Sequence, residues 1–193
     1  MVSNAELDAL VLSMEDFYRP GPVTRTILRS VLFKVYKTKG ELILDSQKRA
    51  STLWWLSKGY AREISTVLTT GGLRTSWFWF TGDFVFANPF FFSQQASLVQ
   101  IEAITDCVLL EISFSDLNKM RKEHMDIELL VERMRTRCDT ERTYLISELL
   151  SLSAKERFEK YYFLHRDLFN VARHKDIADF LRIKDDGFNR FKK

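Results

Sequence analysis

The residues whose types and spacing could bind a ligand are gathered in one stretch, residues 82–103, which reads GDFVFANPFFFSQQASLVQIEA. The stretch opens with a Gly-Asp turn and an aromatic run, breaks at Pro89, passes a polar Ser-Gln-Gln corner and ends in an apolar strand. Such a break inside a small β-barrel lets backbone N–H groups converge on one point, and converging N–H groups bind anions. The stretch therefore predicts an anion cradle set in a β-barrel.

A second group of chemically active side chains is basic and lies at the end of the sequence. The last 21 residues hold seven lysines and arginines against four aspartates, a local charge of 7 − 4 = +3. A basic segment of this size fits contact with nucleic acid, although solvated basic tails are also common. The residues concerned are Arg173, Lys175, Arg182, Lys184, Arg190, Lys192 and Lys193, with Asp176, Asp179, Asp185 and Asp186.

Residues for metal or catalytic chemistry do not combine into a site. Cys107 and Cys138 lie far apart and are the only cysteines, so we expect neither a disulfide framework nor a zinc site. The three histidines, at 124, 165 and 174, lack metal-ligand spacing and are expected to be solvated or capping residues. No Gly-rich phosphate loop, Ser-His-Asp order or carboxylate pair in an apolar pocket can be assembled. We therefore expect no enzyme and no cofactor.

The composition bounds the kind of protein. A chain of 193 residues has room for one large domain or two small ones. Its 46% apolar and 28% charged residues suit a packed core and a soluble protein. No apolar run approaches the roughly 18 residues that span a bilayer, and the N-terminus lacks the basic and apolar regions of a signal peptide. A cytoplasmic protein without a membrane partner is expected.

Local patterns next indicate the elements that position these residues. Residues 3–18 predict a helix, because Ser3 and Glu6 form a capping box and apolar residues recur at helical spacing. From Ile27 onward, short apolar pieces separated by glycine-containing turns predict an antiparallel sandwich or barrel. The predicted strands are residues 32–36, 41–44, 52–57, 60–68, 73–80, 98–103 and 108–112.

The predicted strand at 73–80 is apolar on both faces. Trp77 and Trp79 would lie on one face, with Phe78 and Phe80 on the other. Two apolar faces favour a strand enclosed in a roll; an aromatic binding stripe is the alternative.

Residues 113–120 predict a short helix and residues 126–152 a long one, of roughly 40 Å at 1.5 Å per residue. A helix of that length exceeds what a small domain needs for its own core. Its apolar stripe is expected to pack against the barrel on one side and a second copy of the chain on the other. The alternative is a helix that lies wholly on its own domain. The stripe consists of Ile127, Leu130, Val131, Met134, Cys138, Leu145 and Leu149.

The last forty or so residues predict a hinge and a helix-turn-helix. Ser153 and Glu156 form a second capping box after a hinge at residues 151–153. Beyond a helical pattern at 158–168, residues 174–193 contain two short amphipathic segments joined by a turn at 182–184. The small Ala178 would let the two helices cross closely. Ile177, Ala178, Phe180 and Leu181 would bury the first helix, and Phe188 and Phe191 the second.

The second of these helices is the predicted DNA-recognition helix. It would enter a major groove and expose Asp186, Asn189, Arg190 and Lys193. Arg190 could reach a guanine edge or a phosphate, and Asn189 could pair with adenine. Phosphates would be neutralised by Arg173, Lys175, Lys192 and Lys193.

A series of short motifs, ending in the long helix, carries a family resemblance. The motifs are KGEL at 39–42, LSKGYAR at 56–62, GDF at 82–84 and IEA at 101–103. In this order and spacing, the chain from about Leu28 onward resembles the cyclic-AMP receptor and FNR-type (Crp/Fnr) transcription regulators. The resemblance implies an α+β protein with a cyclic-nucleotide-binding-like double-stranded β-roll, or jelly roll, and an N-terminal helix in residues 1–125. It further implies a long dimerisation helix at 126–152 and a small all-α helix-turn-helix domain without a full wing at 153–193.

The resemblance also implies where an effector would bind. A working cassette of this family carries a Glu for the ribose and an Arg-Ser or Arg-Thr pair for the cyclic phosphate; here those places hold Ala87, Ser97 and Leu98. On the long helix, Arg142 and Thr143 stand where the cyclic-AMP receptor places a pair against adenine. Arg142 could pair with another anion, with Glu141 or with a dimer mate. The implied pocket, degenerate for cyclic AMP, consists of Phe84, Phe86, Ala87, Asn88, Ser97, Leu98, Arg142 and Thr143.

The implied function is regulation of transcription. The effector would be a small molecule other than cyclic AMP, or absent, with Phe84, Phe86, Phe90 and Phe92 filling the cavity. Its partners would be a palindromic DNA operator, a second copy through residues 126–152, and possible contact with RNA polymerase. The DNA-binding helices depart from the family at Arg182, Asp185 and Gly187. The alternative is therefore a sensory or scaffold module of the same fold that acts through protein partners.

Overall fold

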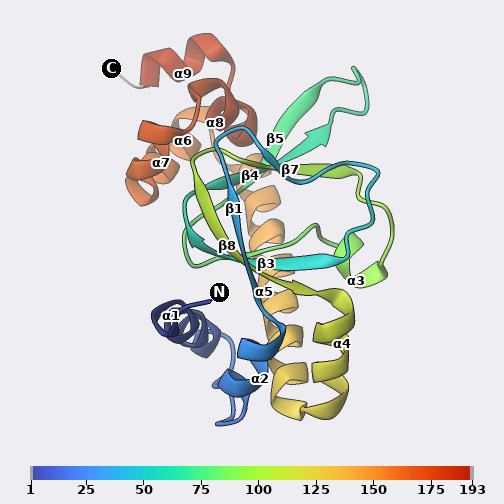
Figure 1. The fold of residues 1–193 in the computed structure, drawn as a ribbon. Helices are drawn as coiled ribbons and strands as arrows, with labels where there is room; N and C mark the ends of the chain where they lie inside the picture. The colour runs from blue at the N-terminus through green and yellow to red at the C-terminus, as the bar shows by residue number, and fades with distance from the viewer. Residues whose placement is uncertain (1, 192–193) are drawn as a thin grey trace.

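The computed structural model describes residues 2–191, without the side chains of residues 185, 186 and 189. It is an α+β protein in which a β-sheet body is flanked by helices at both ends (Figure 1). The helices are α1 (Asn4–Glu15), α2 (Thr24–Val31), α3 (Phe90–Ser93), α4 (Phe114–Glu123), α5 (Met125–Ser151), α6 (Ala154–Leu164), α7 (Arg166–Val171), α8 (His174–Leu181) and α9 (Asp185–Phe191). The strands are β1 (Phe33–Lys37), β2 (Leu42–Leu44), β3 (Thr52–Lys58), β4 (Ala61–Thr66), β5 (Leu73–Trp79), β6 (Phe84–Val85), β7 (Val99–Ala103) and β8 (Cys107–Ser113).

The strands form two four-stranded antiparallel sheets, in the orders β1-β8-β3-β6 and β2-β7-β4-β5. This is the strand order of an eight-stranded jelly roll, so the predicted roll is confirmed. Each of the seven predicted strands is present within a few residues of its expected bounds. The sequence patterns missed β6 and the short helix α3, both of which lie inside the ligand-like stretch at 82–103.

The N-terminal segment confirms one prediction and corrects another. The α1 capping box is present, with Ser3 as N-cap accepting from the Glu6 N–H. Residues 24–31, however, form the helix α2, where strand-like structure was expected from Ile27 onward. The β-branched residues there resemble a strand locally, but burial of Thr24 and Leu28 on one side favours the helix.

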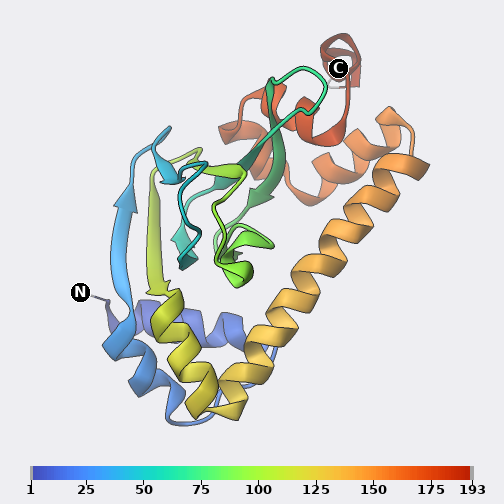
Figure 2. The ribbon, with the colours of Figure 1, turned by 90° about the vertical axis from the view of Figure 1, so that its right-hand side faces the viewer.

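The long helix α5 runs beside the roll from α4 to the C-terminal helices (Figure 2). The predicted apolar stripe faces this chain's own roll: Ile127, Leu130, Val131 and Met134 are buried in its core. Farther along, Tyr144, Ile146 and Leu150 are exposed. The first half of the stripe thus packs on the chain's own roll, as expected, and its contact with a second copy stays a prediction.

Two apolar cores meet at β5. The larger core fills the roll and includes α1, α4 and the first half of α5. The smaller core joins Phe78 and Ile104 of the roll to α6, α7, α8 and α9. The apolar outer face of β5 is therefore covered by the C-terminal helices, not enclosed in the roll as the sequence pattern suggested.

Among the described residues, no helix is both long enough and apolar enough to cross a membrane.

Candidate functional site

The predicted helix-turn-helix is present as α8 and α9. The four residues expected to bury the first helix, Ile177, Ala178, Phe180 and Leu181, are all buried. Phe188 of α9 is buried against Phe158, with ring centroids 5.2 Å apart. Phe191 is partly buried against the same cluster. The sequence pattern therefore located both helices and their inward faces.

The turn between the two helices has the left-handed backbone that usually calls for glycine. Arg182 adopts φ 56° and ψ 45°, directly after α8. The N–H of Ile183 donates to the Ala178 carbonyl at 2.9 Å and closes the turn. A non-glycine residue in this region is strained by roughly 1–2 kcal/mol. The departure of Arg182 from the family pattern thus changes the energy of the turn and preserves its geometry.

A guanidinium from α6 holds this turn in place. Arg157 Nε donates to the Leu181 carbonyl at 2.8 Å, and Nη2 donates to the Arg182 carbonyl at 3.2 Å. Its Nη1 also donates to the carbonyl of Leu152, at the end of α5. A cation at a helix C-terminus complements the helix dipole. Arg157 therefore ties the hinge to the helix pair, a role that nothing in the local sequence indicates.

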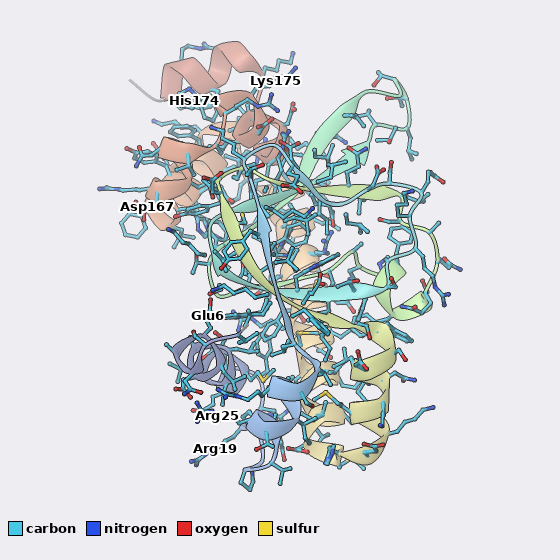
Figure 3. All side chains as sticks on the ribbon, in the orientation of Figure 1. Glu6, Arg19, Arg25, Asp167, His174 and Lys175 are labelled. Atoms are coloured by element: carbon cyan, nitrogen blue, oxygen red, sulfur yellow. The ribbon has the colours of Figure 1, made fainter. Side chains whose placement is uncertain are left out.

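The predicted DNA contacts differ in how the structure places them. Lys175 and Arg190 are exposed, and Figure 3 shows Lys175 and His174 at the end of the molecule that carries α6 to α9. Arg173 is also exposed, but its Nε donates to Asp176 Oδ2 at 2.8 Å. Four predicted contacts lie outside the described residues: the side chains of Asp186 and Asn189, and the whole of Lys192 and Lys193.

The helix pair is docked on the roll through a buried ion network. Asp176, in the first turn of α8, pairs with Arg62 of β4, and both side chains are buried. Arg62 also pairs with Glu102 of β7 at 3.0 Å and donates to Thr75 at 3.1 Å. Removing one member of such a network leaves a buried charge unmatched. The network therefore fixes α8 to the sheet.

Aromatic contacts complete this docking surface. Phe180 of α8 packs edge-on against Phe78 of β5, with ring centroids 5.3 Å apart. It also meets Trp77 at 6.3 Å. Next to them, Phe80 stacks on His165 at 4.5 Å. The alternating aromatics of β5 thus serve both the roll and the helix-turn-helix.

The residues of the predicted effector pocket are not gathered round one cavity. Phe84, Phe86 and Ala87 are buried in the roll core, and Leu98 is 62% exposed. Ser97 is fully buried, and its hydroxyl donates to the Val99 carbonyl at 2.7 Å. The aromatic cluster that fills this part of the roll consists of Phe86, Phe91, Phe92 and Phe114, with the fully buried Phe91 among them.

Asn88 and Thr143, two further polar residues of the predicted pocket, form hydrogen bonds within the chain. Asn88 donates to Asp139 Oδ1 at 2.6 Å. Thr143 is exposed on α5, and its hydroxyl donates to the Asp139 carbonyl at 2.8 Å. These bonds draw both side chains to Asp139 of α5.

Arg142 is the pocket residue with the strongest interaction. It forms a bidentate pair with the buried Glu63 of β4, at 3.1 Å from Nη1 to Oε1 and 2.8 Å from Nη2 to Oε2. Its guanidinium also lies 5.0 Å from the centre of the Trp77 ring. Burial alone would lower the pKa of Arg142, but the Glu63 carboxylate outweighs burial and holds that pKa above the ordinary arginine value. Glu141, a partner considered from sequence, pairs with Arg137 instead.

A cavity of about 380 Å³ lies between the roll, α5 and the C-terminal helices. Its walls combine aromatic rings of β5 with Asp83 of the Gly-Asp turn, Arg137 and Glu141 of α5, and Tyr161 of α6. Burial raises the pKa of Asp83 to about 6, although the Phe80 N–H, which donates to Oδ2 at 2.7 Å, acts in the opposite direction. Of the residues predicted for the pocket, Phe84 and Phe86 line this cavity.

No protein-family model matches the chain, and no curated protein matches it. Its fold, however, is similar to several solved structures. FixK2 of Bradyrhizobium japonicum is 20% identical over 84% of this chain and 83% of its own, with a TM-score of 0.68. The c-di-GMP-responsive global regulator CLP of Xanthomonas campestris is 14% identical over 89% of both chains, with a TM-score of 0.65. The catabolite activator protein of Thermus thermophilus is 17% identical over 93% of this chain and 84% of its own, with a TM-score of 0.57.

These likenesses define the class of fold: the chain has the α+β fold of Crp/Fnr-type regulators. The α+β fold implied by the sequence motifs, a β-sheet domain with helices, is therefore confirmed.

Proposed function

We propose that this chain is a DNA-binding transcription regulator that acts as a homodimer in the cytoplasm. Residues 1–125 would be the sensory roll, 126–152 the dimer helix and 153–193 a helix-turn-helix domain. The observation that carries the proposal is the α8–α9 pair, which combines a left-handed turn at Arg182 with a buried Ala178. The fold shared with known regulators supports it.

DNA contact would come from the exposed side of the helix pair. Lys175 and Arg190 are exposed and can neutralise phosphates or, for Arg190, read a guanine edge. Arg173 would join them if DNA competes with Asp176 for its guanidinium. Asp186, Asn189, Lys192 and Lys193 stay predicted contacts, as does RNA polymerase as a partner.

The test is DNA affinity as a function of salt, measured by fluorescence anisotropy on duplexes selected from a random library. Phosphate contacts make log K fall linearly with log salt. Lys175→Ala should weaken binding to all sequences and lower the salt slope by about 1, whereas Arg190→Ala should also relax sequence preference. Lys48→Ala, an exposed lysine on the roll, is the matched control. Salt-independent binding, or no selected duplex, would overturn the proposal.

The dimer surface we propose is the outward face of α5. Its centre is a row of small residues whose hydroxyls bond to the helix backbone: Thr136 and Thr140 each donate to the carbonyl four residues earlier, at 2.8 Å. The methyl groups are thereby left for packing, and small residues let two helices approach. Two exposed apolar side chains lie on this face at helical spacing: Leu129, seven residues before Thr136, and Tyr144, four residues after Thr140. A second copy of α5 would cover them as in a coiled coil.

Sedimentation velocity tests the dimer. Thr140→Glu places a charge at the centre of the proposed face and should convert the dimer to a monomer. Thr69→Glu, at an exposed threonine of the β4–β5 loop, should leave the dimer intact. A folded wild-type chain that sediments as a monomer at about 50 μM would contradict the proposed dimer surface, because obligate homodimers often have no stable folded monomer.

The effector we propose is not cyclic AMP. A cyclic phosphate needs a cation, and burying it unpaired costs several kcal/mol. The guanidinium of Arg142, which the sequence places in the expected pocket, is already paired with Glu63. Because α8 docks on β4 and β5, a change in the roll would move the helix pair directly.

A second candidate function is a scaffold module that binds protein through α6. Tyr162, Phe163 and Leu164 are exposed there, and Phe163 is 76% exposed. Phe163→Ser should lower the affinity for a protein partner and leave the affinity for DNA unchanged. DNA binding that depends steeply on salt would favour the regulator instead.

A further inference from the structure

The cavity beside Asp83 has the size and the position of an effector site. Its volume of about 380 Å³ falls in the range of about 300–1,000 Å³ that small-molecule pockets occupy. It is bounded by Trp77 and Trp79 of the roll on one side and by Tyr161 and Phe180 of the C-terminal helices on the other. A molecule bound there would contact both the roll and the C-terminal helices.

The charges that line this cavity are mainly negative. Among the described lining residues, three carboxylates (Asp16, Asp83 and Glu141) stand against the single guanidinium of Arg137, a net charge of −2. Arg137 is committed to Glu141 at 2.8 Å and lies 5.0 Å from the centre of the Phe17 ring. Burial raises the pKa of Tyr161 and lowers that of His165, so both groups are neutral at pH 7.

Asp83 is the carboxylate that reaches deepest. Asp16 and Glu141 are exposed, whereas Asp83 is half-buried behind the Gly82 turn. The Phe80 N–H binds its Oδ2, and within the described residues no hydrogen bond is recorded to Oδ1. A carboxylate held in an aromatic wall repels anions and attracts a cation.

We propose that this cavity binds an organic cation, an amine or quaternary ammonium on an aromatic or apolar body, with its charge at Asp83 and its body between the aromatic walls. The inference rests on the proposed function, because it names the class of effector that the regulator would take. Cation–π attraction to the indole rings adds to the charge pairing, and Arg142 over Trp77 shows one such contact already at the cavity wall. The polarity is opposite to that required by a cyclic nucleotide.

The test compares three probes of one shape on the full chain at pH 7.5: 2-phenylethylammonium, 2-phenylethanol and phenylacetate. Binding is followed by calorimetry and by tryptophan fluorescence, since Trp77 and Trp79 line the cavity. For so small a probe, a Kd on the order of 1 mM is expected. The cation should bind about tenfold more tightly than the alcohol, and phenylacetate should bind least.

Two variants locate the binding. Asp83→Asn should lower the affinity for the cation about tenfold and leave the affinity for 2-phenylethanol unchanged. The control is Asp45→Asn, at an exposed aspartate on the roll, which should change neither affinity. Cys138→Phe would fill the cavity and should abolish binding of both. If the cation and the alcohol bind equally, or if either cavity variant binds the cation like wild type, the inference is overturned. Salt-dependent DNA binding would still stand in that case, so the two proposals fail separately.

Discussion

The loop around Ser97 and the cavity beside Asp83 are both places where the roll could hold a ligand, and they differ in what is already satisfied. Ser97 is bonded to Val99, and Arg142, which was expected on the adenine side of the pocket, is bonded to Glu63. Around Asp83 the chain instead leaves a cavity with a surplus of negative charge. The comparison shows that a shared fold does not by itself preserve a ligand-binding site, because the polar groups of the site can instead bond to other groups of the same chain.

The same contrast appears in the two buried arginine networks. Arg142 joins the long helix to β4 through Glu63, and Arg62 joins α8 to β4 through Asp176. Glu63 and Arg62 are neighbours in the sequence, so a single strand anchors both the long helix α5 and the α8–α9 pair. A signal in β4 would reach both elements.

The largest expected effect comes from breaking the buried ion pair between Arg142 and Glu63. Arg142→Ala leaves Glu63 buried and unmatched, and the free energy of unfolding should fall by about 3 kcal/mol. Urea denaturation followed by circular dichroism measures it. Arg137→Ala breaks an exposed pair on the same helix and should cost less than about 1 kcal/mol. Equal losses in the two variants would show that Glu63 and Arg142 are not a buried pair.

The next effect concerns the docking of α8. Asp176→Ala removes a carboxylate bound to both Arg62 and Arg173, and loss of hydrogen bonds to a charged group costs about 1.5–3 kcal/mol. Hydrogen exchange should accelerate in α8 and at the outer face of β5, with the rest of the roll protected. Lys175→Ala, at the exposed neighbour, should change none of these rates. Unchanged exchange in the Asp176 variant would mean that the network does not hold the helix pair.

Asp83 should make the stability of the protein depend on pH. Because the pKa of Asp83 is raised to about 6 from an ordinary value of 3.8, the folded state favours the protonated form. That contribution is complete below about pH 3.8 and is lost as the pH rises through about 6. Asp83→Asn should therefore be more stable than wild type by about 1–2 kcal/mol at pH 7 and gain nothing at pH 3.5. Parallel stability curves for the two chains would place Asp83 in a solvated position.

The smallest effect tests the turn. Arg182→Gly should raise the free energy of unfolding by about 0.5–1 kcal/mol, because glycine adopts the left-handed backbone without strain. Arg182→Ala keeps the strain and serves as the control. A loss of stability in the glycine variant would indicate that the arginine side chain stabilises the turn.

Local signals account for much of what could be predicted. The two capping boxes, at Ser3 with Glu6 and at Ser153 with Glu156, located helix starts correctly. The alternating aromatics located β5 but not its cover, because the covering residue, Phe180, is about a hundred positions away.

The candidate site was harder to predict because it depends on long-range pairs. Glu63 and Arg142 are 79 residues apart, and a charge pattern along the sequence does not pair them. The cavity likewise needs α1, β5, α5 and α6 to be in place before it exists. Sequence reasoning identified the missing phosphate-binding arginine but did not predict that Arg142 pairs with Glu63.

Calorimetric titration of the wild-type chain with cyclic AMP tests most directly whether a roll that lacks the phosphate-binding arginine, and whose Arg142 is paired with Glu63, has lost the nucleotide site. The predicted result is no binding heat up to about 1 mM nucleotide, a limit that corresponds to roughly −4 kcal/mol. Saturable binding below that concentration, abolished by Arg142→Ala, would contradict the account.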